Sequence, residues 1–159
     1  MIKILNYSKE DLYELARHVN KQAKAKGASE SDVEIDVDAG TSVSVRLKEL
    51  ESISLNNDKS LSITVYFGKK RGVATTSDFS KEAIESCLNA ACDIAKFTGE
   101  DKAFGLASSK LFPKKEIELD LYHPFNDSQD AMIAKALVAE TAALSFDKRI
   151  NNSEGANFS

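Results

Sequence analysis

The residues that could support catalysis or bind a metal are few and widely separated. The chain of 159 residues has two histidines, His18 and His123, and two cysteines, Cys87 and Cys92. A helical zinc motif needs two histidines within a few positions, and these two lie far apart in the sequence. Cys87 and Cys92 are separated by about 140° around a helix, so their thiols diverge. We therefore predict no catalytic, cofactor-binding or metal-binding residue in this sequence.

The charged residues follow the pattern of solvated surfaces. Glu34, Asp36 and Asp38 alternate with apolar residues, which is typical of the wet face of a strand. The basic run 69–71 lies in a glycine-flanked turn. The formal net charge of −4 gives no support to a nucleic acid or an anionic membrane as a partner. The sequence also lacks a glycine-rich phosphate loop, a Gly-x-Ser-x-Gly motif and a Cys-x-x-Cys pair.

The main structural signal is an alternation of apolar residues between Asp32 and Ser77. Alternate side chains of a strand point to opposite faces, so this period predicts strands with one buried face. The intervening turn residues are too few for a parallel crossover. We predict an antiparallel meander of about four strands, with a bulge or bend at Ala39–Gly40. The predicted turns lie at Lys48–Glu49, at residues 56–58 and at residues 68–72.

Three other segments have apolar residues at helical spacing behind a capping residue. Ser8 and Asp11 have the spacing of a capping box. His18 lies beside the first apolar stripe, where an ordinary surface histidine is expected. With the meander, these helices predict an α+β fold. The first predicted helix begins after Ser8 and ends before Gly27, and the second begins after Ser80 and ends near Phe97. The third begins after Asp127 or Ser128 and runs to about residue 146.

A long connection at residues 98–126 separates the second and third helices. Gly99, Gly105, Pro113 and Pro124 interrupt any helix there. Connections of this length are uncommon in compact domains. Two interpretations stay open: a functional loop, or a strap across the sheet.

The two ends of the sequence bear on location and domain organisation. The N-terminal segment turns polar too soon for a secretory signal, and no apolar run is long enough to span a bilayer. We therefore expect a cytoplasmic protein. Residues 150–159 are polar and rich in turn residues. We predict an N-terminal α+β domain at 1–149 and, at 150–159, a lead into a missing C-terminal domain.

Several runs of this sequence resemble one known family. The runs DKSLSITVYFGKKRG, DLYHP and NSEGANFS occur in this order, within a match from about Gly27 to Ser159. They are similar to the N-terminal domain of the TldD/PmbA family, whose members are also called modulators of DNA gyrase. Together they favour the PmbA/TldE branch over the TldD branch.

The resemblance implies a subunit of a zinc-dependent protease complex. In this family a PmbA/TldE-like and a TldD-like subunit form a cytoplasmic heterodimer that acts on flexible peptides, including peptide-antibiotic precursors and an antitoxin. The zinc is expected in the TldD-like partner, on a His-Glu-x-x-x-His motif. No position of this sequence matches that motif. The resemblance therefore implies a structural or substrate-guiding segment, without catalytic residues of its own.

A second class of function stays open. The chain could be a free-standing protein-binding module, such as a gyrase modulator, with no part in proteolysis. The family resemblance predicts a longer reading frame beyond Ser159 and a TldD-like partner, whereas a module predicts neither. A self-sufficient hydrolase is disfavoured by the missing motifs.

Overall fold

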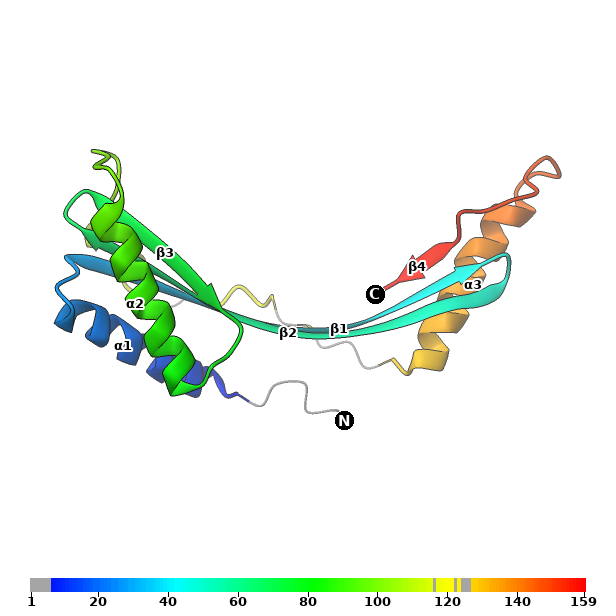
Figure 1. The fold of residues 1–159 in the computed structure, drawn as a ribbon. Helices are drawn as coiled ribbons and strands as arrows, with labels where there is room; N and C mark the ends of the chain where they lie inside the picture. Colours follow the sequence, from blue (N-terminus) through cyan, green and yellow to red (C-terminus); the bar gives the residue numbers. More distant parts are fainter. Residues whose placement is uncertain (1–6, 116, 122, 124–126) are drawn as a thin grey trace. The chain divides into compact units, whose positions relative to one another are not determined.

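Over the residues that the structure describes, the chain has an α+β fold with a four-stranded antiparallel sheet and three α-helices, as predicted (Figure 1). The computed structural model describes residues 7–115, 117–121, 123 and 127–159, so the predicted break at Pro124 lies outside the described residues. The strand order is β3-β2-β1-β4. The elements are α1 (Lys9–Ala25), β1 (Glu30–Arg46), β2 (Glu49–Phe67), β3 (Lys70–Thr76), α2 (Lys81–Phe97), the short 3-10 helix η1 (Ser109–Leu111), α3 (Gln129–Ser145) and β4 (Ala156–Phe158).

The strands that form the sheet differ from the predicted meander in two places. The turn predicted at residues 56–58 is wrong, because β2 runs without a break from Glu49 to Phe67. Ile53, Leu55 and Leu61 keep the same alternation on both sides of these residues, and the strand overrides their local turn propensity. The fourth strand is β4, which comes from the polar tail and pairs antiparallel with β1.

The other turns agree with the sequence. Leu47 and Lys48 both have positive φ angles, 51° and 67°, which is the signature of a type I′ hairpin turn. This turn lies one residue earlier than predicted. A second tight turn at Gly68 joins β2 to β3, which pair antiparallel from Phe67 and Lys70 onward.

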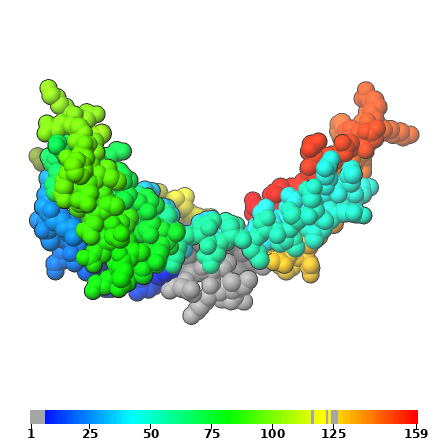
Figure 2. All heavy atoms as spheres, in the orientation of Figure 1, coloured from blue at the N-terminus to red at the C-terminus, as the bar shows by residue number. Residues whose placement is uncertain are grey.

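The chain folds as two compact units, each with a core of its own. Unit 1 comprises residues 1–38 and 58–117, and unit 2 comprises residues 39–57 and 118–159. β1 and β2 each contribute residues to both units. In the space-filling view, atoms of α2 form much of the visible surface of unit 1 (Figure 2).

The core of unit 1 lies between the sheet and the helices α1 and α2. The capping box is confirmed at the start of α1, where Ser8 Oγ accepts a hydrogen bond from the Asp11 amide at 3.1 Å. Ser80 caps α2 in the same position. The fully buried side chains of this core belong to alternate positions of β2 and to one stripe of each helix: Val19, Ala23, Leu61, Ile63, Val65, Ala91 and Ala95.

Gly72 sets the distance between β3 and α2. A Cβ atom at this position would lie 2.0 Å from the carbonyl oxygen of Ala91 and 2.6 Å from the amide nitrogen of Ala95. Both atoms belong to the helix backbone, so no side-chain rotation could make room. The helix therefore packs directly on the strand backbone at this point.

The connection after α2 is fastened to the sheet in unit 1. The Asp101 amide donates to the Lys69 carbonyl at 3.0 Å, and the Leu106 amide donates to Glu30 Oε2 at 3.0 Å. The Arg71 guanidinium lies over the Phe104 ring, 5.1 Å from its centroid. These contacts support the strap interpretation for residues 101–106.

The core of unit 2 is formed by α3, the hairpin at residues 39–57 and β4. Val43 and Val45 of β1 are completely buried against Met132 and Ala136 of α3. Of the two predicted caps for α3, Ser128 is the one used. β4 extends the sheet on the other side of β1 by three residues, with Val43 opposite Phe158.

Candidate functional site

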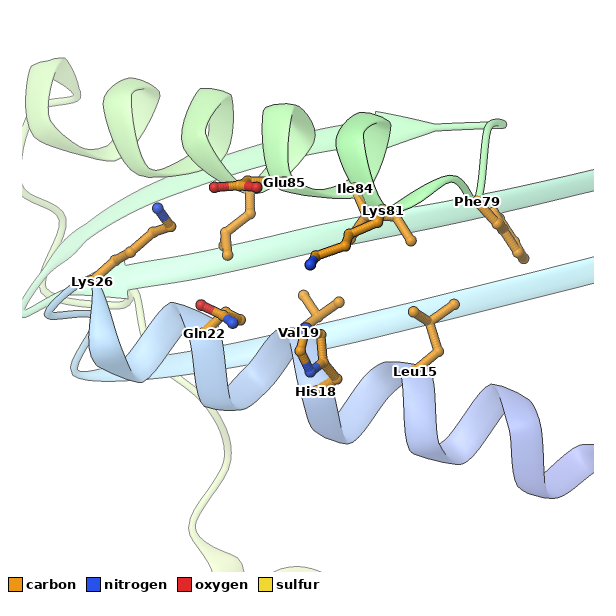
Figure 3. A pocket seen from close by; sticks show the side chains of 10 residues that line it. Leu15, His18, Val19, Gln22, Lys26, Phe79, Lys81, Ile84 and Glu85 are labelled. Carbon is orange, nitrogen blue, oxygen red and sulfur yellow. The ribbon is translucent and has the colours of Figure 1, made fainter.

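A pocket of about 440 Å³ lies between α1 and α2 in unit 1 (Figure 3). Its floor is apolar and is closed by core residues, since Val19 and Leu88 are only 1% and 2% exposed. Leu15 and Ile84 complete this floor, one from each helix. The helices face each other through these side chains because their apolar stripes both turn toward the sheet.

Phe79 forms a wall of the pocket and is held from behind by two other residues. Its ring centroid lies 5.5 Å from that of Tyr7, with the planes at 50°. The Lys59 ammonium lies 4.9 Å from the Phe79 centroid and donates to Tyr7 Oη at 3.1 Å. Aromatic and cation–π contacts of this kind orient the rings. The wall is therefore a fixed apolar surface.

The rim of the pocket is polar and carries more positive than negative charge. Lys26, at the end of α1, points toward α2, and Lys81, in the first turn of α2, points toward His18 and Val19 (Figure 3). Glu85 is the acidic side chain of the rim. Within the part of the chain that the structure describes, the side chains of Lys26, Lys81 and Glu85 form no hydrogen bond or ion pair. Gln22 and His18 complete the polar rim.

The histidines and cysteines do not converge on a metal site. His18 lines the pocket as an exposed side chain, and His123 is exposed elsewhere in the chain. Among residues 7–115, 117–121, 123 and 127–159, no three His, Cys, Asp or Glu side chains form a group that could hold a metal ion. The described residues therefore do not fit a zinc ion.

Cys87 and Cys92 are free thiols in the core of unit 1. Burial raises the pKa of both thiols, and for Cys92 the nearby charges of Lys26 and Lys96 partly oppose this effect. A thiol with a raised pKa is protonated at neutral pH and is a poor nucleophile and metal ligand. Their chemistry is that of small apolar side chains.

Glu140 of α3 is the polar residue that the sequence analysis missed. Its side chain is 1% exposed, and its two carboxylate oxygens accept hydrogen bonds from the amides of Leu47 and Lys48 at 2.8 and 2.7 Å. The Lys48 amide is the main cause of a lowered pKa of Glu140; burial opposes it, and the Leu47 amide and the Ser153 hydroxyl add to it. Glu140 thus binds the β1–β2 turn from inside unit 2. The sequence feature that could have revealed Glu140 is a carboxylate within the apolar stripe of the third helix.

Part of the NSEGANFS run contacts Glu140 as well. The Ser153 hydroxyl, which bonds to Glu140, also accepts a hydrogen bond from the Gly155 amide at 2.8 Å. Gly155 has a φ of +100°, and a Cβ atom there would lie 2.4 Å from the Val45 carbonyl oxygen. The run therefore has a structural role, which is to bring β4 against β1.

Within the described residues, no helix is both long and apolar enough to cross a lipid bilayer.

Sequence comparison identifies relatives of this chain. Residues 32–95 match the family model described as PmbA/TldA metallopeptidase domain 1. The chain is 43% identical over 110 residues to the metalloprotease PmbA of Escherichia coli O157:H7, and 44% identical over 110 residues to a PmbA homologue of Haemophilus influenzae. Each match covers 69% of this chain and 24% of the relative, so the chain spans about a quarter of the length of these proteins.

Solved structures share the fold. A putative modulator of DNA gyrase from Bacteroides thetaiotaomicron superposes with a TM-score of 0.77 over 89% of this chain and 32% of its own, at 22% identity. TldE from Thermococcus kodakarensis superposes with a TM-score of 0.67 over 84% of this chain and 30% of its own, at 18% identity. The family model and the identity to PmbA confirm the resemblance found in the sequence, and this chain belongs to the PmbA/TldD family, whose first domain matches residues 32–95.

Proposed function

We propose that this chain is the first-domain part of a PmbA/TldE-type subunit, which supports a zinc-dependent peptidase complex without cutting the substrate itself. The observation that carries this proposal is the 43% identity to a metalloprotease PmbA over 110 residues. The poor fit of the described residues to a metal ion is in keeping with a supporting role. On this proposal the zinc and the hydrolytic residues belong to a TldD-like partner subunit in the cytoplasm.

The substrates in this proposal are flexible, extended peptides. Among the described residues, β3 is at one edge of the sheet and pairs with β2 on one side only. An edge strand offers backbone groups to which an extended peptide can add as a further strand. Val73, near the middle of β3, is 37% exposed and offers an apolar contact beside these groups. The sheet edge is the feature that supports the proposed guiding role.

We expect hydrolysis to require two different subunits. The native protein that carries this chain, purified alone, is expected to hold no stoichiometric zinc and to leave an unfolded peptide intact. Addition of a TldD-like subunit is expected to give cleavage that a chelator abolishes. Metal analysis and mass spectrometry of the peptide measure both quantities. Zinc at one equivalent, or cleavage by the protein alone, would refute the supporting role.

The sheet edge makes a separate prediction. Titration of the protein with an unfolded peptide is expected to shift the backbone amide signals of β3 in ¹H–¹⁵N NMR spectra, because new interstrand hydrogen bonds form there. The amides of α1 serve as the internal control and should not move. Shifts that avoid β3 would contradict strand addition. Peptide binding at β3 that never influences hydrolysis by the mixed subunits would favour the binding-module alternative.

A further inference from the structure

We propose that the pocket between α1 and α2 binds a small amphipathic carboxylate, with its apolar body on the floor and its carboxylate at the lysine rim. This site does not depend on the proposed role in a peptidase complex, and the residues that line it do not belong to the edge strand β3. Its chemistry follows from three properties: size, an apolar floor, and the arrangement of charge around the opening.

The size of the pocket matches a small molecule. A volume of about 440 Å³ lies within the range of about 300–1,000 Å³ that is typical of ligand pockets. At about 30 Å³ for each water-sized group, it has room for about fifteen such groups. A medium-length alkyl or aromatic carboxylate is of this size.

The floor favours an apolar body. Leu15, Val19, Ile84 and Leu88 cover the bottom with aliphatic carbon, and Phe79 adds a ring at one end. Water over such a surface is displaced favourably by an apolar group. The Lys59–Tyr7 pair keeps the ring of Phe79 in place, so the cavity is largely formed before a ligand arrives.

The rim selects a single negative charge. Lys26 directly follows α1 and points toward α2, whereas Lys81 belongs to α2 and points toward α1 (Figure 3). Their ammonium groups form no ion pair within the described part of the chain, so they are available to a carboxylate. Glu85 on the same rim disfavours a second anionic group through like-charge repulsion. A cationic amphiphile would meet two ammonium groups against one carboxylate.

The probes for a test are three molecules with the same chain and different head groups: decanoate, 1-decanol and decylamine. Binding to the native protein is followed by ¹H–¹⁵N NMR below the concentration at which micelles form. We expect decanoate to bind about tenfold more tightly than decanol, with decylamine weaker still. The shifted amides should belong to α1 and to the first half of α2.

Four variants locate the ligand within the pocket. Lys81→Glu and Lys26→Glu are each expected to weaken decanoate binding about tenfold and to leave decanol binding within about twofold. Lys24→Glu makes the same charge change on an exposed residue of α1 outside the lining, and should have less than a twofold effect. Gln22→Trp places a large ring over the opening and should abolish binding of both molecules.

Two results would overturn the proposal. Equal affinity of decanoate and decanol would show that the lysines do not recognise the carboxylate. Retention of decanoate binding by the folded Gln22→Trp variant would show that the probe binds elsewhere. Because Lys26, Lys81 and Gln22 are exposed, their variants are expected to fold, and the dispersion of the NMR spectra checks this. Neither result bears on the zinc and hydrolysis experiment, so the two proposals fail separately.

Discussion

Replacement of Gly72 by alanine is expected to lower the free energy of unfolding by about 3 kcal/mol, a large value for the addition of one methyl group. The new Cβ atom would lie 2.0 Å from the Ala91 carbonyl oxygen and 2.6 Å from the Ala95 amide nitrogen. Since both are backbone atoms in the C-terminal half of α2, the helix would have to move away from β3. That movement would open gaps in the core of unit 1, which is filled by the same helix.

Urea denaturation of the native and variant proteins measures this effect. Gly99→Ala is the matched control, because no atom lies within 4 Å of a Cβ atom at that position and its φ lies outside the left-handed region. The control is expected to change the free energy of unfolding by less than about 0.5 kcal/mol. If Gly72→Ala were as harmless as the control, the direct contact between α2 and β3 would be absent in solution.

Replacement of Glu140 by alanine is the second change with a large expected effect, and it acts on unit 2. The variant loses both acceptors of the Leu47 and Lys48 amides, which are bound at 2.8 and 2.7 Å, and leaves a cavity beside the turn. We expect the melting temperature to fall by about 10 °C. Glu154→Ala removes an exposed glutamate from the same unit and should have little effect. A similar melting temperature for the two variants would contradict the role assigned to Glu140.

The pH dependence of Glu140→Gln gives an independent check. The pKa of Glu140 in the folded protein is lowered, chiefly by the Lys48 amide, from an ordinary value of 4.5. A lowered pKa contributes stability above the unfolded value, and this contribution is lost as the pH falls through the folded value. The difference in melting temperature between the native protein and Glu140→Gln should therefore be largest near neutral pH and shrink below about pH 4.5. A difference that stays constant down to pH 3 would contradict the assignment.

Local patterns in the sequence were sufficient to predict most of the elements. The caps at Ser8 and Ser80 and the apolar stripes behind them gave the helices, because a helix is defined by contacts a few residues apart. The meander strands followed from alternation. The prediction at residues 56–58 was wrong because asparagine and aspartate favour turns, yet these residues lie within the uninterrupted strand β2.

The parts that could not be predicted depend on residues distant in the sequence. β4 is only three residues long, and its formation depends on a partner, β1, more than a hundred positions earlier. The pocket combines residues from α1 with others from the start of α2, and nothing in either segment alone shows that a cavity remains between them. Glu140 was visible as a carboxylate in an apolar stripe, but its partners are backbone amides, which have no sequence signature.

The bond between Glu140 and the β1–β2 turn also has a consequence for synthesis on the ribosome. The hairpin at residues 39–57 is complete long before the residue that secures its tip has been added. Translation of residues 58–140 takes about 4–16 s at about 5–20 residues per second. During this interval unit 1 can fold, because α2 has already been made. Val43 and Val45 stay uncovered until α3 has been synthesised. For those seconds the nascent hairpin therefore exposes apolar side chains, which favour aggregation.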